Sequence, residues 1–307
     1  MNRILIIRGG ALGDFILTLP ALHALREANP AARIEILGYK HIAVLAEGRF
    51  YANAVRSIEY GPLSGFFARN GELDQELSAY FRSFDLIVSY LFDPDEIFDG
   101  NLGKAGAGRI ITGPGKLGSH THASRQLAQP VQQLGIEVSD FRARLYLSAE
   151  DRAFGEQFVA NAKSDLLTLH PGSGSEQKNW PIEHWLEVGE CLLGRGCSLV
   201  IVAGEADQHQ LKTLQHAWPD RDVLFAINLP LPELAAVLAR SNFLGHDSGI
   251  AHLAAAVGAQ CVVLFGPTDP RVWAPQGSNV RVIEAPAKDL KQLDTSTVLE
   301  SLLPSDV

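Results

Sequence analysis

Residues 245–258 read GHDSGIAHLAAAVG, and residues 262–270 read VVLFGPTDP. In the first stretch an apolar run ends in a polar turn, and a helix of small residues follows directly. The second stretch is another buried strand that ends in a polar turn. A strand, a turn and a helix in this order place backbone N–H groups and a positive helix end at the carboxyl edge of the strand, where a phosphate can bind. Asp247 and Ser248 in the first turn are suited to hold a ribose or sugar hydroxyl. These residues predict an α/β fold that binds a phosphorylated ligand.

Outward from this stretch, apolar strands alternate with helices along the whole chain. The predicted strands of the first half are residues 3–8, 33–38, 55–59, 84–92 and 108–112. Those of the second half are residues 166–170, 198–203, 222–227, 243–245, 261–265 and 280–283. The predicted helices include residues 15–28, with Pro20 in the first turns, and also 41–47, 148–163, 181–193, 205–216, 231–239 and 290–303. Such alternation is typical of parallel sheets covered on both faces.

The pattern restarts near residue 150, which predicts two doubly wound domains, residues 1–150 and 151–307. The terminal helix could pack back on the first domain. Ligands of such sheets bind beyond the carboxyl ends of the strands. Two sheets that face each other would form a cleft between the domains.

Composition narrows the class of protein. The chain has 307 residues, 46% of them hydrophobic and 20% charged, which is ordinary for a globular protein. The chain has 35 Asp and Glu residues against 26 Lys and Arg residues, and this acidic balance argues against general nucleic-acid binding.

The sequence predicts no signal peptide, because Arg8-Gly9-Gly10 interrupts the first apolar run. No stretch approaches the roughly 20 apolar residues of a membrane span. We expect a cytoplasmic protein that can work at a membrane surface.

The cysteines indicate neither a metal site nor a disulfide framework, because they are few and match no metal-ligand spacing. They are expected to be buried thiols: Cys191, Cys197 and Cys261.

The turn after the first strand reads RGGALGD at residues 8–14. It lacks the G-x-G-x-x-G pattern of dinucleotide-binding proteins and the G-K-[ST] of a P-loop. The turn would still let the backbone approach a ligand closely through Gly10, Ala11, Leu12 and Gly13. Asp14 stands where the turn becomes a helix. It could act as a general base facing a cleft, or it could only cap the helix.

The turn after the first strand of the second half reads HPGSGSEQKNWP at residues 170–181. Lys178 is suited to a diphosphate as a point charge, and the alternative is a solvated loop lysine. His170 and His252 could each bind phosphate or satisfy a hydrogen bond in the core.

Two further segments leave their interpretation open. Residues 93–96, DPDE, follow a strand and could hold a divalent metal, but Pro94 stiffens the turn and a solvated acidic loop at the cleft rim is favoured. The segment 101–125 has no acidic residue and could receive an anionic acceptor or could be a mobile loop. Its basic residues are Lys104, Arg109, Lys116, His120, His122 and Arg125.

Taken together, these turns resemble glycosyltransferase family 9, the bacterial heptosyltransferases. The resemblance rests on four motifs in order: R-x-G-A-L-G-D at 8–14, K-x-W-P at 178–181, D-S-G-x-x-H at 247–252 and G-P-T-D-P at 266–270. It implies a GT-B architecture, with two Rossmann-like domains facing a cleft and a nucleotide sugar bound mainly by the second. It also implies metal-independent, inverting transfer from a nucleoside-diphosphate sugar, typically ADP-heptose, to the inner core of lipopolysaccharide.

Carried over by position, the resemblance implies that Asp14 is the general base and Lys178 the cation at the diphosphate. The donor would also contact Ser173, Ser175, Asp247, Ser248, Gly249 and His252, with Leu229 or Leu231 near the base. No metal ligand and no cofactor besides the nucleotide-sugar co-substrate is implied. The acceptor would be a glycolipid or glycan, with possible peripheral association at the inner face of the inner membrane.

Other functions remain compatible with the sequence. A dinucleotide-dependent oxidoreductase could also have two Rossmann-like units, although the glycine pattern is missing. A non-catalytic nucleotide-sugar binder could retain the same fold. The same chemistry could use another nucleotide sugar or another acceptor, because residues 61–82 carry only Arg69 and Arg82 as basic residues.

Overall fold

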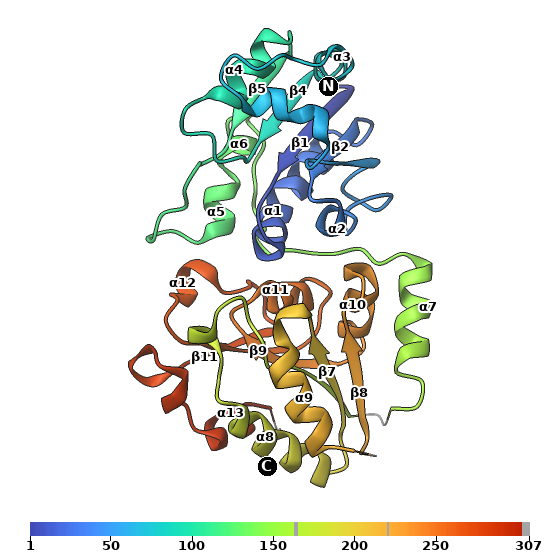
Figure 1. The fold of residues 1–307 in the computed structure, drawn as a ribbon, viewed down its shortest axis with the longest axis vertical. Coiled ribbons are helices and arrows are strands. Elements are labelled where there is room, and N and C mark those ends of the chain that lie inside the picture. The colour runs from blue at the N-terminus through green and yellow to red at the C-terminus, as the bar shows by residue number, and fades with distance from the viewer. Residues whose placement is uncertain (163–164, 220, 303–307) are drawn as a thin grey trace. The chain divides into compact units, whose positions relative to one another are not determined.

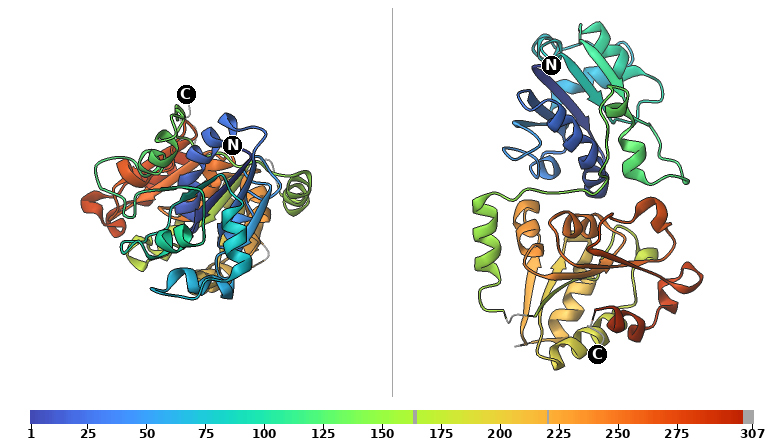
Figure 2. Two further views of the ribbon diagram at one scale, coloured as in Figure 1. Left: turned by 90° about the horizontal axis from the view of Figure 1, so that it is seen from above. Right: turned by 180° about the vertical axis from the view of Figure 1, so that it is seen from behind.

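The computed structural model describes residues 1–162, 165–219 and 221–302 (Figure 1). The chain divides into two compact units, Met1–Phe141 and Arg142–Val307. The second unit thus begins before residue 150. The connecting segment belongs to it because the backbone N–H of Leu145 donates to the carbonyl oxygen of Ala256, and helix α7 packs against α10 (Figures 1 and 2).

The first unit is built on a parallel sheet with strand order β3-β2-β1-β4-β5. Its strands are β1 (Arg3–Arg8), β2 (Arg33–Gly38), β3 (Ala54–Ser57), β4 (Leu86–Ser89) and β5 (Arg109–Thr112). Its helices are α1 (Leu12–Ala28), α2 (Lys40–Ala43), η1 (Gly61–Phe67), α3 (Gln75–Arg82), α4 (Ile97–Lys104), α5 (Ala123–Leu127) and α6 (Gln129–Gln132). From β1 the chain winds one way to β2 and β3 and later the other way to β4 and β5. The switch point of this doubly wound sheet therefore lies between β1 and β4.

Apolar side chains cover both faces of the first sheet. On one face Leu5 and Leu37 share a core cluster with Phe81 of α3 and Phe98 of α4. Ile6 of β1 points to the opposite face, because side chains alternate along a strand, and it too is fully buried. Burial on both faces explains why these strands read as continuous apolar runs.

Helix α1 begins at Leu12, earlier than the predicted start at residue 15. The carboxylate of Asp14 stabilises this start, because its Oδ2 accepts a hydrogen bond from the backbone N–H of Ala11 at 3.0 Å. Pro20 consequently lies inside the helix and not in its first turns, so the prediction for Pro20 was wrong.

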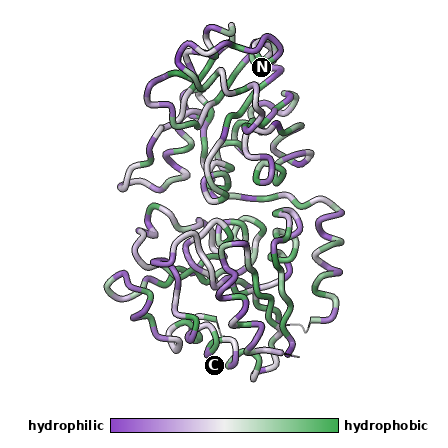
Figure 3. The backbone as a smooth tube through the Cα atoms, in the orientation of Figure 1, coloured by the Kyte–Doolittle hydropathy of each residue, from purple (hydrophilic) through white to green (hydrophobic). Residues whose placement is uncertain are grey.

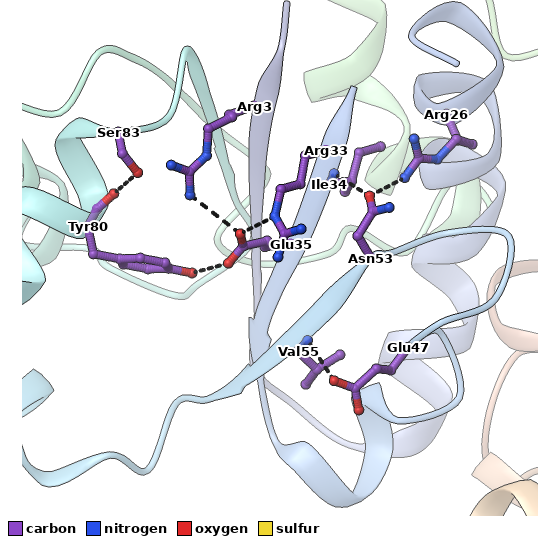
Figure 4. A network of polar contacts seen from close by, with 10 residues as sticks. All are labelled: Arg3, Arg26, Arg33, Ile34, Glu35, Glu47, Asn53, Val55, Tyr80 and Ser83. Atoms are coloured by element: carbon purple, nitrogen blue, oxygen red, sulfur yellow. Dashed lines mark hydrogen bonds and ion pairs between the residues drawn. The ribbon is translucent and has the colours of Figure 1, made fainter. Parts of the chain in front are cut away.

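A buried carboxylate, Glu35 in the middle of β2, contacts side chains of β1, β2 and α3 in the first unit (Figure 4). Its Oε1 accepts from Nε of Arg33 at 2.9 Å and lies 3.4 Å from Nη2 of Arg3. Its Oε2 accepts from the hydroxyl of Tyr80 in α3 at 3.2 Å. Two cations and a hydroxyl thus compensate a charge that would otherwise be costly to bury. The network joins β1, β2 and α3 away from the switch point.

The second unit contains a parallel sheet with strand order β11-β10-β9-β6-β7-β8. Its strands are β6 (Leu166–His170), β7 (Ser198–Ala203), β8 (Val223–Ile227), β9 (Asn242–His246), β10 (Cys261–Phe265) and β11 (Val280–Glu284). Its longer helices are α7 (Ala149–Phe158), α8 (Ile182–Gly194), α9 (Gln208–Ala217), α10 (Leu231–Leu238), α11 (Gly249–Ala256) and α13 (Thr295–Leu302). Short helices complete it: η2 (Glu176–Lys178), η3 (Glu205–Asp207), α12 (Pro270–Trp273), η4 (Pro286–Lys288) and η5 (Leu290–Gln292). The switch point of this sheet lies between β6 and β9.

The core of the second unit is apolar along its strands, as the mainly hydrophobic colouring of the sheet in Figure 3 shows. Trp185 of α8 and Val298 of α13 belong to one core cluster with strand residues. The terminal helix packs against α8 of its own unit. That it also packs on the first unit stays a prediction. Residues 163 and 303, the predicted ends of two helices, lie outside the described residues.

The structure also bears on the predictions for the cysteines, for membrane spans and for metal sites. Cys261 is buried, which raises the pKa of its thiol to about 12, whereas Cys191 and Cys197 are only partly buried. Within the described part of the chain, no helix has the length and apolar character needed to span a bilayer. The same residues contain no cluster of three or more His, Cys, Asp or Glu side chains suited to a metal ion.

Candidate functional site

The polar residues of the second unit gather at the carboxyl edge of its sheet, at the switch point. Strands β6 and β9 are neighbours, with His170 opposite Gly245, and they end at His170 and His246. The loop after β6 carries Lys178, and the turn after β9 carries Asp247. In doubly wound sheets the switch point is where ligands bind.

At this edge Lys178 and Asp247 form an ion pair, in which Nζ lies 2.7 Å from Oδ2. The hydroxyl of Thr268, in the turn after β10, donates to the same Oδ2 at 2.7 Å. The Lys178 side chain keeps 29% of its surface exposed, and the Asp247 side chain keeps 10%. An ammonium group has three donors, so Lys178 can bind an anion while one donor stays on Asp247.

Helix α11 starts directly beside this ion pair. Ser248 is its N-cap, and the Ser248 hydroxyl accepts from the backbone N–H of Ala251 at 3.4 Å. Gly249 is the first helical residue, and His252 is buried within the helix. The first N–H groups of a helix have no partner inside it and carry partial positive charge. Lys178 and this helix start therefore favour an anion at the same edge.

The other predicted donor residues lie in two places. Ser173 stands in the loop after β6, where its Oγ lies 2.7 Å from both the Ser175 carbonyl oxygen and Oδ1 of Asn179. Ser175 itself is exposed. Leu231 begins α10 after β8, two strands away from β6, and thus stands apart from the Lys178 ion pair.

A carboxylate that was not predicted from the sequence, Asp207, lies at the same edge and is only 6% exposed. Its Oδ2 accepts from the Gly204 backbone N–H at 2.8 Å and lies 3.8 Å from Nε2 of His170. Burial raises the pKa of Asp207, but the interaction with His170 and the hydrogen bond from Gly204 outweigh it, and the pKa lies below its ordinary value. The other ring nitrogen of His170, Nδ1, lies 3.4 Å from the Ser248 hydroxyl.

His246, the last residue of β9, was also not predicted as a site residue, and it is completely buried. Its Nε2 accepts a hydrogen bond from the backbone N–H of Trp180 at 2.8 Å. The sequence held one signal for His246, a polar residue at the end of an apolar strand and directly before Asp247. It gave no sign of the partners of His246, because these are backbone groups.

At the switch point of the first unit, Asp14 is held from β1. The Arg8 side chain is 9% exposed, and its Nη2 donates to the Asp14 carbonyl oxygen at 2.9 Å and lies 3.8 Å from Asp14 Oδ1. Burial lowers the pKa of Arg8, against the attraction of Asp14. Arg8 also donates to the hydroxyl of Thr18 at 2.9 Å, and its guanidinium carbon lies 5.9 Å from the centre of the Tyr90 ring. These contacts leave the Asp14 side chain 38% exposed.

The rest of the first turn shapes the position of Asp14. Gly10 has φ +91°, a left-handed conformation in which a Cβ would also meet Oδ2 of Asp14. Ala11 is the N-cap of α1, and Leu12 and Gly13 belong to its first turn. Asp14 thus caps the helix and keeps an exposed carboxylate, so the two interpretations of this residue are compatible.

Within the acidic segment 93–96, Asp93 has a structural role. Asp93 directs both oxygens to backbone N–H groups, Oδ1 to Ile97 and Oδ2 to Asp99, each at 3.0 Å. This carboxylate shapes the loop into α4, with Glu96 at φ +53° as the residue before the helix. The acidic loop is therefore explained as a local backbone structure.

A sequence model of glycosyltransferase family 9 (heptosyltransferase) matches residues 118–302. The chain belongs to this family. Lipopolysaccharide heptosyltransferase 1 of Escherichia coli K12 is 31% identical over 158 residues, which make up 50% of this chain and 49% of that protein. The chain thus spans about half the length of the curated relatives that it first matches.

Solved structures of family members have the same fold over nearly the whole chain. A family 9 glycosyl transferase from Veillonella parvula superposes with a TM-score of 0.81 at 21% identity, covering 98% of this chain and 97% of the other. The E. coli heptosyltransferase WaaC with ADP gives a TM-score of 0.75 at 19% identity and covers 98% of both chains. The predicted family and the GT-B fold class, with two Rossmann-like parallel-sheet units, are confirmed.

Proposed function

We propose that this family 9 chain is an inverting, metal-independent glycosyltransferase. It would move a sugar, with heptose as the first candidate, from an ADP-linked donor to a hydroxyl of a lipopolysaccharide core or related glycan. The observation that carries the proposal is the Lys178–Asp247 ion pair beside the start of α11, at the switch point of the second sheet. This site offers the partly exposed Lys178 cation and helix N–H groups to a diphosphate, and Asp247 and Ser248 to hydroxyl groups.

In the proposed reaction the acceptor hydroxyl loses its proton to the carboxylate of Asp14. The acceptor oxygen forms a bond to the anomeric carbon as the bond from that carbon to the diphosphate oxygen breaks. The electron pair of the broken bond leaves on the nucleoside diphosphate, and the anomeric configuration inverts. Lys178 and the N–H groups at Ser248 and Gly249 stabilise the charge that grows on the leaving group, an effect that is often the largest in catalysis.

The choice of ADP rests on the relatives, since WaaC was solved with ADP. The choice of a glycolipid acceptor rests on the same relatives, whose names describe lipopolysaccharide heptosyltransferases. Such an acceptor would bring the protein to a membrane surface, and we include peripheral association with the inner face of the inner membrane in the proposal.

A panel of ADP, UDP, GDP and their sugars, measured by thermal shift, tests the donor. A ligand that binds only the native state raises the melting temperature, and ADP and ADP-heptose are expected to give the largest shifts. A larger shift with UDP or GDP would reject the proposed base. ADP release from ADP-heptose, with and without an inner-core acceptor and in the presence of EDTA, separates an enzyme from a binder and tests metal independence.

A further inference from the structure

The loop that carries Lys178 has little regular structure of its own. It runs from the end of β6 to the start of α8, includes Gly172 and Gly174, and contains only the short helix η2. Chain segments of this composition have many accessible conformations and lose entropy when they are fixed. The loop is held partly by its own bonds between Ser173, Ser175 and Asn179. Contacts from outside the loop add to what sets the position of the Lys178 ammonium group.

His246 contacts the loop at both of its ends. Its Nε2 accepts from the backbone N–H of Trp180 at 2.8 Å, at the end of the loop. Its Nδ1 lies 3.3 Å from the carbonyl oxygen of Gly172, at the beginning. A single side chain on β9 thus bridges the two points where the loop leaves and rejoins the fold.

The partners of His246 fix its tautomer. A backbone N–H can only donate, so Nε2 must carry the lone pair. The single proton of a neutral imidazole then resides on Nδ1, which donates to the carbonyl oxygen of Gly172. A doubly protonated ring would lose the bond to Trp180, because it has no acceptor.

The surroundings keep the ring neutral and in place. His246 is fully buried, and burial lowers its pKa to about 3. Its ring packs against Trp185 of α8 in a T-shaped arrangement, with ring centres 5.2 Å apart. The Trp180 indole is also anchored, since its Nε1 donates to the Leu293 carbonyl oxygen at 2.9 Å.

We infer that His246 is a positioning residue of the donor site, whose neutral imidazole clamps both ends of the 171–180 loop and thereby places Lys178 against Asp247. The inference rests on the proposed function for the ligand, but the clamp itself is a property of the chain. Asp247 directly follows His246, so one strand end holds both the loop and the partner of its cation. A histidine that merely fills the core would affect stability without a specific effect on Lys178.

A double-mutant cycle on the full chain tests this coupling by calorimetry with ADP. His246→Leu is expected to weaken ADP binding about tenfold in the wild-type background and less than twofold in the Lys178→Ala background. His246→Gln, which can still accept from Trp180, is expected to recover part of the affinity. His184→Leu is the matched control, because its ring also packs against Trp180, at 5.0 Å between centres, and its Nδ1 has no hydrogen-bond partner among the described residues. Equal effects of His246→Leu in both backgrounds would overturn the inference.

Two measurements without ligand test whether His246 holds both ends of the loop, and they do so even if ADP does not bind. Long-range ¹H–¹⁵N spectra of the wild-type protein should show His246 protonated on Nδ1 and bare on Nε2 at pH 7. Hydrogen exchange at the Trp180 amide should be at least tenfold faster in His246→Leu than in His184→Leu, with His246→Gln between the two. The opposite tautomer, or unchanged exchange, would contradict the clamp. Absence of ADP binding to the wild-type protein, with both signals as expected, would reject the proposed function alone.

Discussion

The ammonium group of Lys178 lies 2.7 Å from the carboxylate of Asp247, although the two residues come from loops after different strands. The ion pair holds the Lys178 ammonium group at the carboxyl edge of the second sheet, and the ammonium group neutralises the largely buried Asp247 carboxylate. A bound diphosphate would share this cation with Asp247.

Replacing Lys178 by alanine is expected to weaken ADP binding by about 10- to 100-fold, because a hydrogen bond to a charged group contributes about 1.5–3 kcal/mol. Calorimetry measures the change. Lys212→Ala, on the exposed side of α9, is the control and should leave the affinity unchanged. Equal affinities of the Lys178 and Lys212 variants would remove Lys178 from the donor site.

Replacing Asp14 by asparagine is expected to lower turnover by about 100-fold or more, since general-base catalysis contributes about 10²–10⁴. Affinity for ADP should stay nearly unchanged. Asp151→Asn is a matched control, because Asp151 occupies the same position in α7 and its Oδ2 accepts from the Ser148 backbone N–H at 2.7 Å. Turnover of the Asp14 variant close to that of the control would show that Asp14 only caps its helix.

The loop after β6 contains two glycines with different surroundings. A Cβ at Gly172 would collide with the carboxylate of Asp207, whereas nothing lies within 4 Å of a Cβ at Gly174. Gly172→Ala should lower the free energy of unfolding by about 1–3 kcal/mol, as overpacking does. Gly174→Ala should stay within about 0.5 kcal/mol of the wild type. Urea denaturation compares them, and equal stabilities would mean that Asp207 can move aside at no cost.

The fold followed from the sequence to a large extent, because buried parallel strands such as β1, β6 and β7 are continuous apolar runs. The helices α3 and α4 were missed in a region rich in polar residues. A signal existed for α3, since Asp74 caps it and Leu77 and Phe81 are one helical turn apart.

The candidate site was only partly predictable. Lys178 and Asp247 could be placed at one edge, because each follows a strand of a parallel sheet. Their ion pair depends on strand order, which the sequence does not state. The role of His246 could not be predicted, since its partners are backbone atoms 66 and 74 residues away in the chain.

Acid should destabilise the protein through His246. The folded chain keeps this imidazole neutral down to about pH 3, because burial lowers its pKa. The unfolded chain takes up a proton below about pH 6.5, so acid favours the unfolded state between these two values. From pH 7 to pH 5 this linkage costs about 2 kcal/mol. Urea denaturation of His246→Gln should show a correspondingly smaller loss over this range, and an identical loss would mean that the buried imidazole is not the cause.

The most direct test of the donor site is a crystal structure of the full chain with ADP. The account predicts the diphosphate within hydrogen-bonding distance of Lys178 Nζ and of the N–H groups that begin α11, with the ribose near Asp247 or Ser248. ADP bound elsewhere, with the Lys178–Asp247 pair untouched and no phosphate at the start of α11, would contradict it.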